Sequence, residues 1–83
     1  MNKAILLISE DWEGLFINGK LIEEGHTLNE GLSRIKYFVG LAKKYNFDLA
    51  KMKEIELCEK DEQYLCDYGS FPNNIEELNG SYQ

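Results

Sequence analysis

The stretch WEGLFINGKLIEEGH, residues 12–26, predicts a β-hairpin, from which the rest of the strand order follows. Asn18-Gly19 stands at its centre, and Asn-Gly accepts the positive φ angles that both central positions of a type I′ turn require. Such a turn fixes the cross-strand pairs: Ile17 with Lys20, Phe16 with Leu21, and Leu15 with Ile22. Both faces of the hairpin are then apolar, so each face needs cover.

Two further strands are indicated on either side of the hairpin. KAILLIS (3–9) has four consecutive apolar residues, a pattern typical of a central strand that is covered on both faces. KMKEIELCEK (51–60) alternates polar and apolar residues and predicts a fourth strand at 53–58. A right-handed crossover from the hairpin places this strand parallel to the first, which gives the strand order 3-2-1-4.

The crossover segment predicts one long helix over residues 28–45. Thr27 and Glu30 have the spacing of a capping box, and Asn46 suits the position after the last helical residue. At 100° per residue, the apolar side chains that we expect to face the sheet fall on one arc: Leu28, Leu32, Ile35, Phe38, Val39, Ala42 and Tyr45.

The rest of the chain predicts short helical elements. We expect Asp61 to cap a helix that Gly69 ends, one further turn after Pro72, and a frayed tail at 79–83. Residues 1–83 thus form a single α+β domain of order β-β-β-α-β, an antiparallel meander plus one parallel strand. The long helix covers one sheet face, and either the segment 61–78 or a second subunit must cover the other.

Composition restricts the function classes. The net charge is −6, with +1 over residues 1–53 and −7 over 54–83, so broad nucleic-acid binding, which needs phosphate neutralisation, is not expected. No apolar run is long enough to span a membrane, and no signal peptide is evident, which favours the cytoplasm. Cys58 and Cys66 are expected to be free thiols. We expect no metal and no cofactor.

Catalytic signatures are missing from the sequence. Gly14, Gly19 and Gly25 do not match a phosphate-binding cradle between a strand and a helix. There is no nucleophile elbow and no zinc-protease motif. His26, the only histidine, lies near no orienting motif that would pair it with a cysteine. We therefore expect a binding protein rather than an enzyme.

One stripe of the long helix lies outside the expected core arc and carries binding-type side chains. It runs through Arg34, Tyr37, Leu41 and Lys44, with Lys36 nearby. Three interpretations stay open. The stripe stacks a base and holds phosphates, or it contacts a protein or a second copy, or the acidic C-terminal segment folds over it and brings Leu78 to Leu41.

The quoted hairpin also resembles the opening of a family of short proteins from bacteriophages and bacteria with no assigned activity. The matching residues are Trp12, Gly19, Lys20, Leu21 and His26, and YGSFPNNIEEL (68–78) is similar to the closing segment of that family. The resemblance implies a phage-encoded accessory protein in the host cytoplasm. Such a protein acts by binding, either inhibiting a host defence protein or sequestering a phosphate-bearing signalling nucleotide.

The resemblance places Trp12 and His26 in one pattern at the two ends of the hairpin. The predicted register brings them to one corner beside the N-terminus of the long helix, where Thr27 and free amides attract anions. Such a corner is either a small-ligand site or a tryptophan lid over a thin core. Two alternatives to the binding function remain, a small structural or regulatory homodimer and a small nucleotide-processing enzyme.

Overall fold

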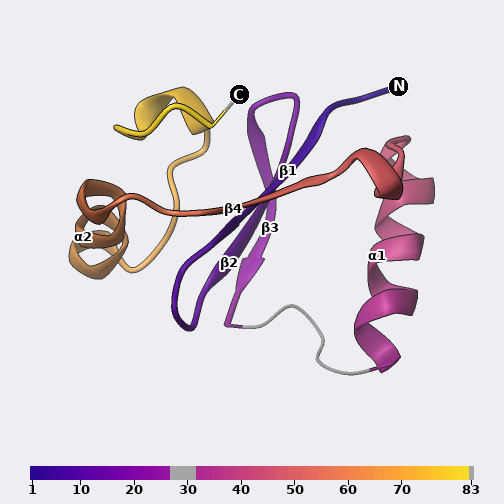
Figure 1. The fold of residues 1–83 in the computed structure, drawn as a ribbon, viewed down its shortest axis with the longest axis horizontal. Helices are drawn as coiled ribbons and strands as arrows, with labels where there is room; N and C mark the ends of the chain where they lie inside the picture. Colours follow the sequence, from indigo (N-terminus) through magenta and orange to yellow (C-terminus); the bar gives the residue numbers. More distant parts are fainter. Residues whose placement is uncertain (27–31, 83) are drawn as a thin grey trace.

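The structure, a computed structural model, describes residues 1–26 and 32–82 and shows a four-stranded mixed sheet between two helical layers (Figure 1). The strands are β1 (Ala4–Ile8), β2 (Glu13–Ile17), β3 (Lys20–Gly25) and β4 (Lys53–Glu56). Their order is β3-β2-β1-β4, and β1 pairs antiparallel with β2 and parallel with β4. The predicted α+β class and strand order are therefore confirmed.

The hairpin turns as the Asn-Gly pair predicts, but its register changes along the strands. Asn18 and Gly19 have φ angles of 51° and 84°. Ile17 pairs with Lys20 and Phe16 with Leu21, as expected, but a β-bulge then places Leu15 opposite Glu23. The expected pair of Leu15 with Ile22 is therefore wrong, because the extra residue of the bulge shifts every later pair by one.

Each face of the sheet carries its own apolar cluster. The α1-side cluster lies beneath helix α1 (Leu32–Tyr45), and its buried members are Ala4, Leu6, Leu15, Ile17, Phe38, Leu41 and Phe47. The C-terminal-side cluster lies beneath helix α2 (Glu59–Tyr68) and the short 3-10 helix η2 (Ile75–Glu77). Its buried members are Ile5, Leu7, Phe16, Leu65, Phe71, Ile75, Leu78 and Tyr82.

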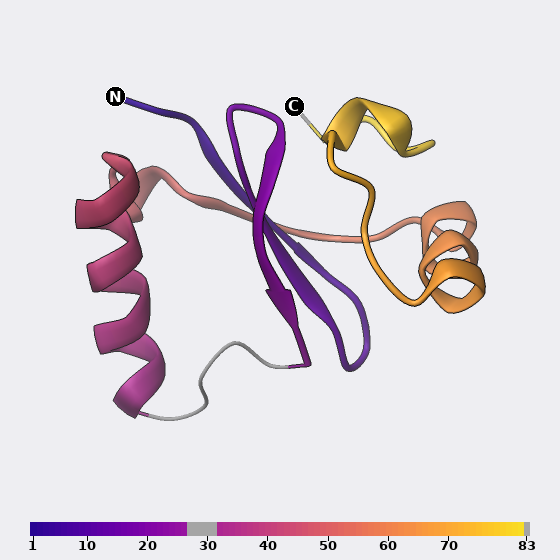
Figure 2. The ribbon, with the colours of Figure 1, turned by 180° about the vertical axis from the view of Figure 1, so that it is seen from behind.

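Figure 2 shows the same arrangement from behind, with α1 on one side of the sheet and the C-terminal elements on the other. A second 3-10 helix, η1 (Leu49–Lys51), links α1 to β4. The chain's own C-terminal segment thus covers the second face, one of the two covers expected for it. None of the helices among the described residues has the length and apolar character needed to cross a membrane.

Helix α1 ends where the sequence predicts but turns a different side to the sheet. Asn46 follows its last residue with a φ of 54°, as expected of a C-cap. Leu41, expected on the outer stripe, is 7% exposed and belongs to the α1-side cluster. Ile35 and Val39, expected in the core, are 63% and 39% exposed. The predicted start of the helix and the Thr27–Glu30 capping box lie outside the described residues.

The C-terminal segment departs from expectation at two points. Cys58, not Asp61, is the N-cap of α2, while Gly69 closes the helix with a φ of 73° as predicted. Residues 79–82 are not a frayed tail, because Tyr82 is only 5% exposed and packs in the C-terminal-side cluster. Leu78 packs in that cluster too, so the segment does not fold over α1 and Leu78 does not meet Leu41.

Candidate binding surface

A bidentate ion pair joins α1 to the sheet. Glu13 lies two and four residues before Leu15 and Ile17 on β2, so its side chain faces α1 as theirs do. Its carboxylate is buried, and Arg34 donates from Nη1 to Oε1 and from Nη2 to Oε2, each at 2.8 Å. The Arg34 guanidinium also lies 4.9 Å from the centre of the Phe38 ring. Arg34 therefore anchors α1 on the sheet.

This ion pair accounts for the side that α1 presents to the sheet, which differs from the side that the sequence predicts. The helix brings Arg34 inward to meet a buried carboxylate, and Phe38 and Leu41 follow on the same side. Tyr37 is half-buried against the α1-side cluster, and burial, with the nearby Glu23 charge, raises the pKa of its hydroxyl. Of the expected stripe, only Lys44 stays exposed, with Nζ 5.3 Å from the Tyr45 ring centre. The stripe is thus not a continuous surface.

The side of α1 that faces away from the sheet carries a different group of residues. Ile35 and Val39 lie one turn apart, and Lys36 and Lys43 lie beside them on the same side of the helix. All four are exposed. We call these four residues the outer patch. It combines two β-branched apolar side chains with two lysines, whose methylene stems extend the apolar area.

A groove adjoins the outer patch between α1, η1 and β4. Its volume is about 280 Å³, and its lining residues are Arg34, Ile35, Phe38, Leu49, Met52 and Glu54. Ile35 belongs both to the groove and to the outer patch. The floor consists of side chains that pack on the α1-side cluster, whereas Arg34 and Glu54 supply charge. An apolar side chain from another molecule would fit such a groove.

Trp12 and His26 meet at one corner at the ends of the hairpin, as the predicted hairpin indicates. The Trp12 and His26 rings lie 5.0 Å apart, edge to face. Trp12 Nε1 donates to Glu24 Oε1 at 3.0 Å, and the Phe71 amide donates to the same oxygen at 2.9 Å. This contact ties the end of the hairpin to the C-terminal segment, and it uses the indole N–H. Thr27 lies outside the described residues.

A second polar cluster holds the last residues of the chain. Asp61 is completely buried, and its carboxylate accepts hydrogen bonds from the Asn79 and Gly80 amides at 2.7 and 2.8 Å. It also accepts from the Tyr82 hydroxyl at 2.5 Å and from the Cys58 thiol at 3.2 Å. Burial alone would raise the Asp61 pKa, but these donors lower it to about 2. Burial and the Asp61 bond raise the Tyr82 pKa.

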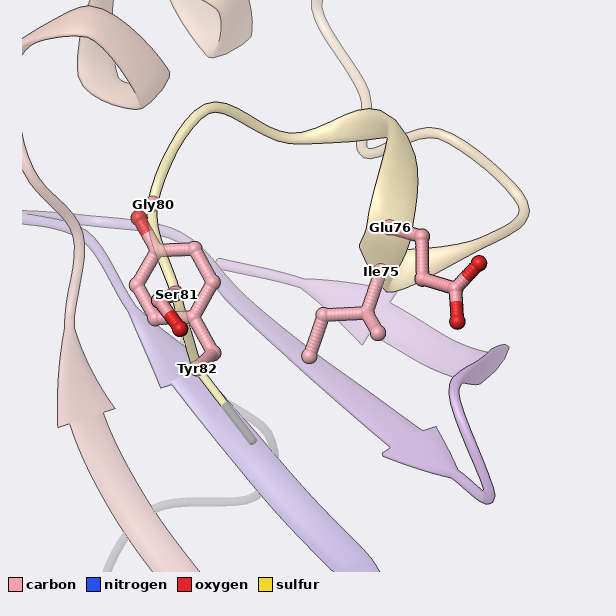
Figure 3. Close-up of a pocket in the computed structure, with 5 residues that line it drawn as sticks. All are labelled: Ile75, Glu76, Gly80, Ser81 and Tyr82. Carbon is pink, nitrogen blue, oxygen red and sulfur yellow. The ribbon is translucent and has the colours of Figure 1, made fainter.

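Figure 3 shows a shallow hollow beside this cluster, between η2 and the end of the chain. Its volume is about 300 Å³, and Ile75, Glu76, Gly80, Ser81 and Tyr82 line it. The Glu76 carboxylate points away from Tyr82, whose own hydroxyl is already engaged by Asp61. We assign this hollow to the packing of the tail rather than to a ligand.

Within residues 1–26 and 32–82, no group of three or more His, Cys, Asp or Glu side chains is placed to hold a metal ion. Both cysteines are exposed free thiols. Comparison of the chain with protein-family models, with curated proteins and with solved structures gives no match.

Sequence reasoning missed the structural roles of Glu13 and Asp61, whose acidic side chains are buried. A signal for Glu13 was present, because the alternation of β2 puts it on the same face as Leu15 and Ile17. A carboxylate on a covered face needs a cation, and Arg34 is the nearest basic residue on the following helix. Asp61 offered no comparable signal, since most of its donors come from residues 79–82, a segment that the sequence predicts to be frayed.

Proposed function

We propose that this chain acts by binding another protein through the outer patch of α1. The observation that carries the proposal is the exposure of Ile35 and Val39 on the outer side of a helix in a domain whose two sheet faces are already covered. Exposed apolar side chains that adjoin a groove are typical of protein contact sites. Lys36 and Lys43 keep the surface soluble and select partners by charge.

A protein fits this surface better than a phosphate-bearing nucleotide does. On α1, the nucleotide hypothesis used Arg34 and Lys44 to hold phosphates and Tyr37 to stack a base, and its second candidate site was the corner at Trp12, His26 and Thr27. The Arg34 guanidinium already meets both carboxylate oxygens of Glu13, and Tyr37 packs half-buried against the α1-side cluster. A nucleotide would have to displace a bidentate, charge-assisted pair before it bound.

A symmetric homodimer through the outer patch is also disfavoured. A two-fold axis through the patch would bring Lys36 and Lys43 of one copy close to the same lysines of the other. Like charges at such an interface oppose association. The partner is therefore a different protein. The resemblance to phage proteins makes host defence proteins, which the chain would inhibit in the host cytoplasm, the partner class to test first.

The test is capture from bacterial lysate with matched variants. The tagged wild-type chain should retain a specific protein that Ile35→Glu does not retain. Tyr68→Glu is the matched control, because Tyr68 is also a large exposed side chain, at 70%, but lies on α2 across the sheet. Mass spectrometry of the eluates identifies the protein. Equal capture by Ile35→Glu and the wild type would refute the proposal.

A further inference from the structure

We infer, building on the function proposed above, that the partner presents an acidic amphipathic helix to α1. The groove beside the outer patch gives the first reason. Its volume of about 280 Å³ lies just below the range of pockets for drug-sized ligands, roughly 300–1,000 Å³. It therefore suits one or two side chains. Because Ile35 lines both features, a partner that covers the patch can place an apolar side chain in the groove.

Charge gives the second reason. Residues 32–53, which form α1, η1 and the start of β4, contain six Lys or Arg and a single Asp, a net charge of +5 in a chain of −6. Residues 54–82 carry −7, and α2 and η2 within that range lie on the far side of the sheet (Figure 1). The α1 layer therefore attracts an acidic surface and repels a basic one.

The shape of the patch gives the third reason. Ile35 to Lys43 covers eight residue steps, about 12 Å along a helix at 1.5 Å per residue. A second helix can lay its own ridge of side chains along such a ridge and beside the groove. An extended peptide would instead need a free strand edge for its hydrogen bonds, and the patch lies on a helix.

Glu54 refines the chemistry of the inserted side chain. It is the acidic residue of the groove lining, so the partner residue that enters there is uncharged. The acidic residues of the partner helix lie on its flanks, where they meet Lys36 and Lys43. Glu54→Gln should then strengthen binding of an acidic helix by up to tenfold, because one like-charge repulsion disappears.

The probe is an 18-residue fluorescein-labelled peptide with leucines at helical spacing on one side and glutamates on its flanks. Its matched control has lysine in place of every glutamate, and a second control carries a central proline that breaks the helix. Fluorescence anisotropy with the full chain should show binding of the glutamate peptide alone. The double variant Lys36→Glu/Lys43→Glu should weaken binding at least tenfold, Val39→Asp should do the same, and Tyr68→Glu should change nothing.

Three results would overturn this inference. They are equal binding of the lysine peptide, equal binding of the proline peptide, and full affinity in the double lysine variant. Sedimentation of the chain alone covers a fourth outcome: concentration-dependent association that Val39→Asp abolishes and Tyr68→Glu does not would make a second copy the occupant of the outer patch. If lysate capture depends on Ile35 while the glutamate peptide does not bind, the proposed function stands and the acidic helix is wrong.

Discussion

Asp61→Asn should be the most destabilising polar substitution on the C-terminal side of the sheet. The buried carboxylate accepts hydrogen bonds from two backbone amides, the Asn79 side-chain amide, one hydroxyl and one thiol. An asparagine side chain keeps one acceptor oxygen and turns an NH₂ group toward donors. Hydrogen bonds to a charged group are each worth roughly 1.5–3 kcal/mol, and part of that is retained by the remaining oxygen.

The lowered pKa of Asp61 expresses the effect of the same hydrogen bonds on the charged carboxylate. Lowering the Asp61 pKa from 3.8 to about 2 corresponds to roughly 2 kcal/mol of stability at neutral pH, at 1.36 kcal/mol per pKa unit. We therefore expect Asp61→Asn to reduce the free energy of unfolding by about 2–4 kcal/mol. A chain of 83 residues has roughly 4–12 kcal/mol in total, so the variant would stay folded at low temperature but be markedly less stable.

The sign of the pH dependence follows from the lowered pKa. A carboxylate with a lower pKa in the folded state stabilises the fold above its unfolded pKa, and that contribution disappears as the pH falls toward 2. The wild type loses this contribution on acidification, whereas Asp61→Asn lacks it at every pH. The stability gap between the two should therefore narrow by about 2 kcal/mol from pH 6 to pH 2.

Urea unfolding followed by circular dichroism measures both effects. Asp67→Asn is the matched control, because Asp67 is an exposed carboxylate on the same helix that accepts a hydrogen bond from Gln63. The free energy of unfolding of Asp67→Asn should stay within about 0.5 kcal/mol of the wild-type value. The proposed role of this carboxylate is wrong if Asp61→Asn and the wild type unfold at the same urea concentration. It is also wrong if the difference between their free energies of unfolding does not change with pH.

Three further substitutions test the α1 anchor, the close packing of the sheet and the outer patch. Arg34→Met should lower the free energy of unfolding by about 2–3 kcal/mol. A double-mutant cycle with Glu13→Gln should give a coupling energy of at least about 1 kcal/mol, and additive losses would contradict the role of the ion pair as an anchor. Gly14→Ala should lower the free energy of unfolding by about 1–3 kcal/mol, because the added Cβ would lie 2.5 Å from the Phe71 ring. A variant as stable as the wild type would show that the ring moves freely. Ile35→Glu should change stability by less than about 0.5 kcal/mol in the same urea assay, and a larger loss would mean that Ile35 supports the fold.

The strand topology was predictable because short-range signals decide it. The Asn18-Gly19 turn sets the hairpin, and the unbroken apolar run of β1 requires a central position covered on both sides. The crossover rule then leaves one place for β4. The bulge after Phe16 was not predictable, because Leu15 and Ile22 fit the regular register equally well by pattern and only the packing of the whole sheet decides between them.

The candidate site was predicted less well, for a physical reason. Periodicity ranks the sides of a helix by hydrophobicity alone, and Ile35 and Val39 made the wrong side of α1 look like the core. The actual orientation depends on a long-range ion pair with Glu13, twenty-one residues away in the sequence. The proximity of Trp12 and His26 was predicted correctly, because it follows from the hairpin itself.

Site-specific photocrosslinking tests the central claim, that the outer patch of α1 is a protein-binding surface, most directly. Val39 is replaced in one variant by the photoreactive amino acid benzoylphenylalanine, and Tyr68 is replaced in the other. After irradiation in bacterial lysate, the Val39 variant should form a discrete adduct with one protein, and the Tyr68 variant should not. An adduct of that same protein at Tyr68 and none at Val39 would contradict the claim.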